Sequence, residues 1–132
     1  KDNYFVFKNR ETGHYVEAVA TIMPQKLPVY LLLSSYIFGA DKRPSGNQAF
    51  SSYMEIGYIH QFKGDNSMTV LVGAEINKGF YTSYEKKISV CNVAAKYVTS
   101  VSFGKYKLPV SASLVFNPYK EKAYFTFSAY LR

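Results

Sequence analysis

The chain has 132 residues, which suits one domain and leaves no room for a second. Its formal net charge is +7, and its aromatic residues are 13 Tyr and 10 Phe with no Trp. The single cysteine, Cys91, excludes an internal disulfide and cysteine-rich zinc or iron–sulfur sites. The longest apolar run, residues 29–33, is far below the ~18 residues that a transmembrane helix needs.

Apolar and polar side chains alternate along eight runs of the chain, and helical periodicity is almost absent. Several runs reach ten residues or more, whereas strands of soluble proteins average about five to six. Tilted strands that cross a bilayer need ~9–11 residues. Run length therefore indicates a membrane β-barrel; the runs are 4–8, 14–23, 28–39, 50–62, 67–77, 88–103, 107–117 and 122–132.

Each run has one apolar and one polar face. In the run 67–77, Met68, Val70 and Val72 share a face opposite Thr69 and Gly73. The run 28–39 is ambiguous because residues 31–33 are all Leu. Ser, Thr, Tyr, Gly and Asn dominate the polar faces, where an open soluble surface would be rich in Lys and Glu. This composition favours a narrow barrel interior.

The connections between the runs alternate in length. Tight turns are expected at 63–66 and 104–106, and long loops at 39–49 and 78–87. Outer-membrane barrels have short periplasmic turns and long external loops. We therefore predict that residues 1–132 form a single all-β domain, an antiparallel up-and-down transmembrane β-barrel with about eight strands, located in the outer membrane.

Four charged residues fall on the polar faces within the runs: Glu17, Glu55, Glu75 and Lys96. A charge inside a narrow barrel is costly unless it is paired. We expect these four to meet in the lumen, either as an ion-pair network that fills the barrel or as a lining that selects a solute. A catalytic carboxylate pair would need a nucleophile or a substrate cleft that the sequence does not indicate.

No motif predicts an enzyme, a cofactor or a metal site, and neither His14 nor His60 stands in a cluster of ligands. The basic residues gather in turns, as at Lys42–Arg43 and Lys86–Lys87, and such runs are usually solvated. Because the aromatics do not interleave with them, no nucleic-acid partner is predicted. The loop 78–87 places aromatic residues beside lysines, which suits an interfacial girdle or a contact surface.

Several stretches resemble a group of Bacteroidetes (Gram-negative) outer-membrane β-barrel proteins of unknown function, related to the TorF-type candidate porins. The resembling stretches are Thr12-Gly-His-Tyr-Val-Glu-Ala, residues 27–41, residues 48–58, Val93-Ala-Ala-Lys, Lys107-Leu-Pro-Val and Val115-Phe-Asn-Pro. The resemblance implies a membrane barrel and supplies no catalytic residues. Members of the group carry further strands upstream, so the chain is either a small barrel or the C-terminal part of a barrel with 10–12 strands.

Together these observations predict a non-enzymatic outer-membrane protein that is either a narrow porin or a structural or accessory subunit. Its expected partners are outer-membrane lipid and another outer-membrane protein. Strand number separates the two roles, since side chains fill an eight-strand barrel. The alternative is a soluble, lipocalin-like ligand-binding barrel, with its apolar faces inward and its three strand glutamates outward.

Overall fold

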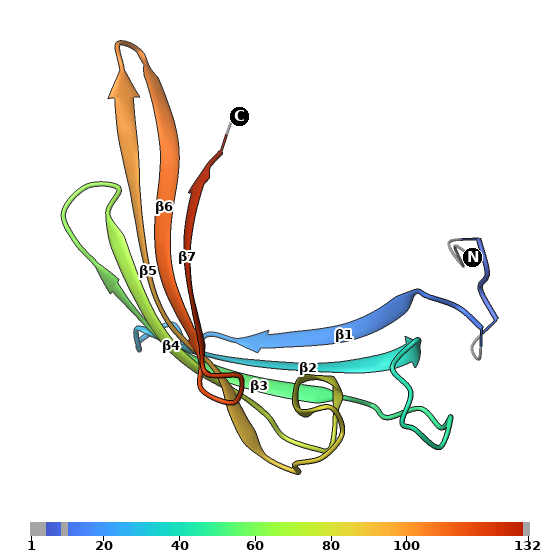
Figure 1. Cartoon of the computed structure of the whole chain (residues 1–132). Helices are drawn as coiled ribbons and strands as arrows, with labels where there is room; N and C mark the ends of the chain where they lie inside the picture. The colour runs from blue at the N-terminus through green and yellow to red at the C-terminus, as the bar shows by residue number, and fades with distance from the viewer. Residues whose placement is uncertain (1–4, 9–10, 131–132) are drawn as a thin grey trace. The chain divides into compact units, whose positions relative to one another are not determined.

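The computed structural model describes residues 5–8 and 11–130, and it is built from β-strands (Figure 1). Consecutive strands are neighbours in one sheet with the order β1-β2-β3-β4-β5-β6-β7. This confirms the predicted all-β, antiparallel, up-and-down arrangement. The elements are β1 (Tyr15–Ile22), β2 (Val29–Gly39), β3 (Ser52–Gln61), β4 (Ser67–Glu75), the 3-10 turn η1 (Phe80–Thr82), β5 (Ser89–Phe103), β6 (Tyr106–Asn117) and β7 (Lys122–Ala129).

Seven of the eight predicted runs are strands, so the count of about eight is corrected to seven within the described residues. The first run, 4–8, is not a strand at residues 5–8, and its residue 4 lies outside the described residues, as do 131 and 132 of the last run. The backbone turns at this point, because the N–H groups of Glu11 and Thr12 both donate to the carbonyl of Lys8, each at 2.9 Å. A ring stack between Phe7 and His14 accompanies the turn.

The registers of β5, β6 and β7 confirm the two-faced pattern in this part of the sheet. Leu114 lies opposite Ala95 on one side and Phe125 on the other. One residue earlier in β6, Ser113 lies opposite Lys96 and Thr126. Residues directly opposite each other in an antiparallel pair share a face. Apolar and polar rows therefore alternate across the three strands.

Pairing with β1 resolves the ambiguous leucines of β2. Leu31 and Leu33 lie opposite Ile22 and Ala20, whereas Leu32 lies opposite Thr21. A shift of register between Val16 and Glu17 leaves one extra residue in β2. Such a bulge bends the strand and turns the side chains that follow it to the other face.

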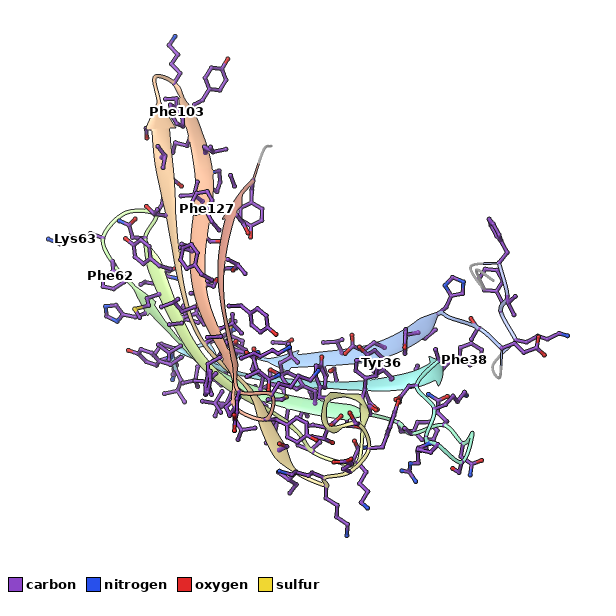
Figure 2. The ribbon with its side chains drawn as sticks, in the orientation of Figure 1. Tyr36, Phe38, Phe62, Lys63, Phe103 and Phe127 are labelled. Atoms are coloured by element: carbon purple, nitrogen blue, oxygen red, sulfur yellow. The ribbon has the colours of Figure 1, made fainter. Side chains whose placement is uncertain are left out.

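Tight turns form where glycine permits a left-handed backbone. Phe103 pairs with Tyr106, which leaves a two-residue loop that begins at Gly104 with φ of 60°. Two-residue hairpin loops require such positive φ values. Figure 2 shows Phe103 at the tip of this hairpin and Lys63 on the turn between β3 and β4.

The chain divides into two compact units. The first takes in the residues before Met23, Leu31–Glu55 and Ala74–Ser89; the second takes in Met23–Tyr30, Ile56–Gly73 and the residues after Ser89. Both long loops, 40–51 and 76–88, thus belong to the first unit. Within the described ranges, no helix has the length and apolar character to cross a bilayer.

In the second unit, an aromatic ring covers a glycine of the neighbouring strand. Gly57 is buried, and a Cβ added there would overlap the ring of Tyr30. The missing side chain thus lets the tyrosine lie flat against the sheet, a packing known to compensate for glycine in strands.

We predict that Gly57→Ala lowers the free energy of unfolding by about 1–3 kcal/mol, because the added methyl group displaces the Tyr30 ring. Gly13→Ala is the matched control, since a Cβ there has nothing within 4 Å. Urea unfolding followed by circular dichroism measures both. In a Tyr30→Ala background the cost should shrink, and an unchanged cost would contradict this packing.

Candidate functional site

The sheet exposes its apolar side chains and covers its polar ones. In β4, exposed Met68, Val70 and Val72 alternate with less exposed neighbours, and Glu75 at the strand end is 0% exposed. The same inversion continues in the second unit, where Leu114 is 64% and Phe127 65% exposed. We call this side the apolar face; within the second unit its exposed members include Ile56, Tyr58, Met68, Val70, Val72, Tyr97, Leu114, Phe116, Phe125 and Phe127.

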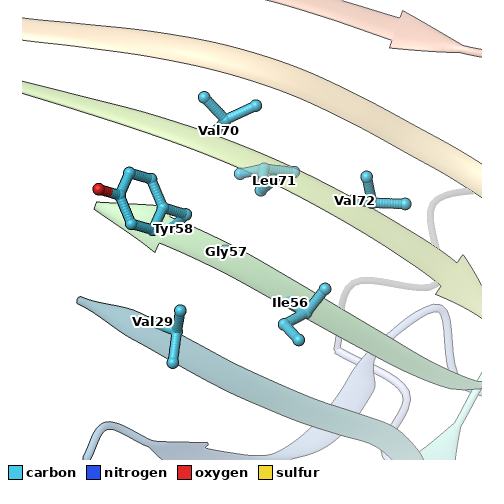
Figure 3. Close-up of a pocket in the computed structure, with 7 residues that line it drawn as sticks. All are labelled: Val29, Ile56, Gly57, Tyr58, Val70, Leu71 and Val72. Atoms are coloured by element: carbon cyan, nitrogen blue, oxygen red, sulfur yellow. The ribbon is translucent and has the colours of Figure 1, made fainter. Parts of the chain in front are cut away.

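A hollow of about 300 Å³ lies on the apolar face over β2, β3 and β4 (Figure 3). Its lining carries no charged side chain, and the phenol of Tyr58 is its only side-chain polar group. Ligand sites combine apolar walls with several convergent polar groups that fix orientation. This hollow lacks them, so it suits hydrocarbon chains and not a polar substrate; it is lined by Val29, Ile56, Gly57, Tyr58, Val70, Leu71 and Val72.

The structure gives the four predicted lumen charges different surroundings. Glu17 is exposed, and the partly buried Glu55 accepts a hydrogen bond of 2.5 Å from the hydroxyl of Tyr53. Glu75 is fully buried against the loop that follows it. Lys96 lies in the second unit, on the polar row with Ser113. A meeting of all four in a lumen stays a prediction.

Glu75 holds the 3-10 turn η1 in place. Its Oε1 accepts from the N–H of Tyr81 at 3.0 Å. Its Oε2 accepts from the N–H of Thr82 at 2.8 Å and from the Thr82 hydroxyl at 2.6 Å. Gly79 passes close enough that a Cβ would overlap both this carboxylate and the side chain of Ser51. A buried carboxylate with several N–H and O–H donors is stably accommodated.

Asp41 holds the loop 40–51 in place. Its Oδ2 accepts from the N–H of Ser51 at 2.7 Å, and its Oδ1 accepts from the Ser51 hydroxyl at 2.6 Å. The Tyr84 hydroxyl also donates to Oδ1, at 3.3 Å. Burial, followed by the charge and hydrogen bond of Asp41, raises the pKa of Tyr84 to about 12. The phenol therefore remains a protonated donor at neutral pH.

Ser51 connects Asp41 with the turn η1 that Glu75 holds, and Asn77 forms a second bridge between the two loops. The N–H of Phe80, in η1, donates to the Ser51 hydroxyl at 2.8 Å. Asn77 donates from Nδ2 to the carbonyl of Phe50 at 2.6 Å and accepts from the N–H of Ser52 at 3.0 Å. These bonds connect residues 25 to 29 positions apart, so the two long loops form one hydrogen-bonded body, which we call the loop platform (residues 40–51 and 76–88).

Aromatic rings bring the loop platform against the strands. Tyr81 lies 5.9 Å from Tyr53 of β3, and Phe80 lies 6.4 Å from Tyr15 of β1, between ring centroids. Tyr15 in turn lies 5.2 Å from Tyr36 of β2. Because Tyr36 pairs with Glu17 and Tyr53 shares a face with Glu55, the loop 76–88 packs on the polar side of the sheet.

The sequence analysis missed the residues that build this platform. Asp41, Ser51 and Thr82 lie in loops, where no periodicity distinguishes a structural side chain from a solvated one. Glu75 was noted as a strand charge with Lys96 as an expected partner. Gly79, between Asn77-Lys78 and Phe80-Tyr81, could have indicated this packing, since glycine often stands where another part of the chain approaches the backbone closely.

Among the described residues, no group of three or more His, Cys, Asp and Glu side chains could hold a metal ion. No family model, no curated protein and no solved structure matches this chain. The two faces and the loop platform are the features of the chain that bear on its function.

We predict that Glu75→Gln loosens the turn η1. Both oxygens of the Glu75 carboxylate accept hydrogen bonds, but the NH2 group of glutamine cannot accept one. At least one bond from Tyr81 or Thr82 is therefore lost. A hydrogen bond to a charged group contributes about 1.5–3 kcal/mol, so exchange of these two amides should accelerate about tenfold or more. Hydrogen–deuterium exchange measures this. Exposed Glu85→Gln in the same loop is the control, and equal protection in both variants would refute the role of Glu75.

Proposed function

We propose that this chain is a non-enzymatic, barrel-forming protein of an outer membrane, with lipid against its apolar face. The observation that carries the proposal is the inverted burial of the strands. Leu, Phe and Val side chains are exposed, while Ser, Gly and Glu at the alternate positions are covered. Such an inversion is expected where one face meets hydrocarbon and the other meets a narrow polar interior.

A soluble, lipocalin-like barrel would need the opposite arrangement. Its apolar faces would form the core and its strand glutamates would meet water. Of the three strand glutamates, Glu75 is instead fully buried, Glu55 is partly buried and Glu17 is exposed. The exposed apolar side chains of the second unit lie on adjacent strands from β3 to β7. Large exposed apolar surfaces mark contact with membrane or with another protein. These facts favour the membrane over the soluble alternative.

Within the proposal, the polar face lines the barrel interior and the loop platform narrows it. The loop 76–88 packs over Tyr53 and Tyr15 on that face and does not extend away from the strands. A constricted interior suits a structural or accessory subunit better than a freely conducting porin. The relation to the TorF-type candidate porins remains part of this proposal.

Adjacent positions on β7 offer a sharp test of the lipid-facing surface. Phe127 (Figure 2) and Thr126 are both exposed and point to opposite faces. Phe127→Lys should reduce stability in lipid vesicles by about 2–4 kcal/mol, the cost of a lysine near the bilayer midplane. Thr126→Lys should cost at most about 1 kcal/mol. The readout is the folded fraction, measured by the mobility of unboiled samples in gels. Equal, small effects of the two substitutions would identify a water-exposed surface and overturn the membrane proposal.

Conductance in planar bilayers distinguishes the two roles. We expect the unmodified chain to show little or no single-channel conductance, because the loop 76–88 occupies the polar side. Glu75→Gln should raise the conductance by releasing that loop, whereas Glu85→Gln should not. High conductance that is unchanged by Glu75→Gln would contradict a constriction by this loop and favour an open porin.

A further inference from the structure

A second hollow, of about 430 Å³, lies within the loop platform and differs from the apolar one in its charge. Three of its lining residues are cationic and none is acidic. The cations come from both long loops: Arg43 from the loop 40–51, and Lys78 and Lys87 from the loop 76–88. Tyr84 and Asn77 add polar lining. All of these residues belong to the first unit.

No salt bridge found in the part of the chain that the structure describes involves these three cations; Lys107 pairs with Asp65 there. The guanidinium of Arg43 makes a single long hydrogen bond, 3.4 Å from Nη2 to the carbonyl of Ala49. Lys78 and Lys87 are exposed. Three positive charges close together repel one another, and a bound anion would reduce this repulsion. The hollow therefore favours an anionic ligand.

The nearby carboxylates of Asp41 and Glu75 form no ion pairs with these cations, because neutral N–H and O–H donors occupy their oxygens. Asp41 accepts from Ser51 and Tyr84, Glu75 accepts from Tyr81 and Thr82, and both carboxylates are 0% exposed. Both carboxylates also have a positional effect. Asp41 stands two residues before Arg43, and Glu75 stands three residues before Lys78. The two anchors thus fix the loop segments that present the cations.

We propose that this hollow binds a phosphate group, carried by a small phosphomonoester or by a lipid headgroup. A phosphate dianion matches several cations better than a single carboxylate does, and its oxygens accept bidentate bonds from an arginine fork. The volume lies in the range of ligand sites, about 300–1,000 Å³, and so admits the group that carries the phosphate. Tyr84 lines the hollow as a protonated phenol and adds no negative charge.

Isothermal titration of the full chain in non-ionic detergent tests the site, with inorganic phosphate, glycerol 3-phosphate and glycerol as probes. Both phosphates should bind and glycerol should not. The triple substitution Arg43→Gln, Lys78→Gln and Lys87→Gln should weaken phosphate binding at least about tenfold, which corresponds to ~1.4 kcal/mol. These three residues lie in loops outside the strands, and circular dichroism verifies that the variant keeps its fold.

The matched control removes the same charge elsewhere, by Lys63→Gln, Lys105→Gln and Lys120→Gln, all exposed and outside the hollow. It should change the affinity less than about twofold, because these three lysines are exposed to solvent and do not line the hollow. If both triple variants weaken phosphate binding equally, the effect comes from net charge alone, and the proposed phosphate site is wrong. Absence of any phosphate binding to the unmodified chain would overturn it too.

A lipid arm distinguishes the two sources of the phosphate. Short-chain phosphatidic acid and phosphatidylcholine are added to the same micelles, since only the first carries a phosphomonoester. Tighter binding of phosphatidic acid than of glycerol 3-phosphate, with no binding of phosphatidylcholine, assigns a lipid headgroup. Equal binding of phosphatidic acid and glycerol 3-phosphate assigns a soluble ester. The inference goes beyond the proposed membrane function and does not depend on it, because the phosphate titration does not require the strands to contact lipid.

Discussion

The two-residue period of the β-strand is the constraint on which the other features depend. Because successive side chains point to opposite faces, one register decides at once which residues are exposed and which are covered. In β5, β6 and β7 the pairing places Leu114 with Phe125 and Ser113 with Thr126. A slip by a single residue would bring Lys96 into the apolar row, so the two faces and the register fix each other.

The strands expose apolar side chains and cover polar ones, and two carboxylates are buried where the long loops meet the strands. Here Asp41 and Glu75 are fully buried, and hydroxyl and backbone N–H donors satisfy them without a lysine or arginine. A buried carboxylate adds specificity because it tolerates few alternative arrangements of its donors. This explains how two loops whose one helical element is the short turn η1 keep a defined form against the strands.

The sequence was informative wherever a local rule applied and uninformative where distant residues meet. Alternation predicted seven of the strands, and Gly104 marked its turn, because both signals depend on neighbouring residues. The strand predicted over residues 4–8 was wrong, because a stretch of five residues is too short for alternation to distinguish a strand from a segment that leads into a turn at Lys8. The bond between Tyr84 and Asp41 links positions 43 residues apart, and the cationic hollow follows from such links. No periodicity encodes them.

The two-residue loop at Gly104 also has a consequence for the order of folding. Its hairpin joins β5 and β6 through eleven residue pairs and requires only the shortest possible chain closure. Hairpins of this kind form on the order of 1–10 μs, whereas contacts between remote segments wait for the chain to search. We expect β5 and β6 to nucleate the sheet and the loops around Asp41 to order last. By the same logic these loops are the first to open, so ligand exchange there can proceed while the strands remain paired.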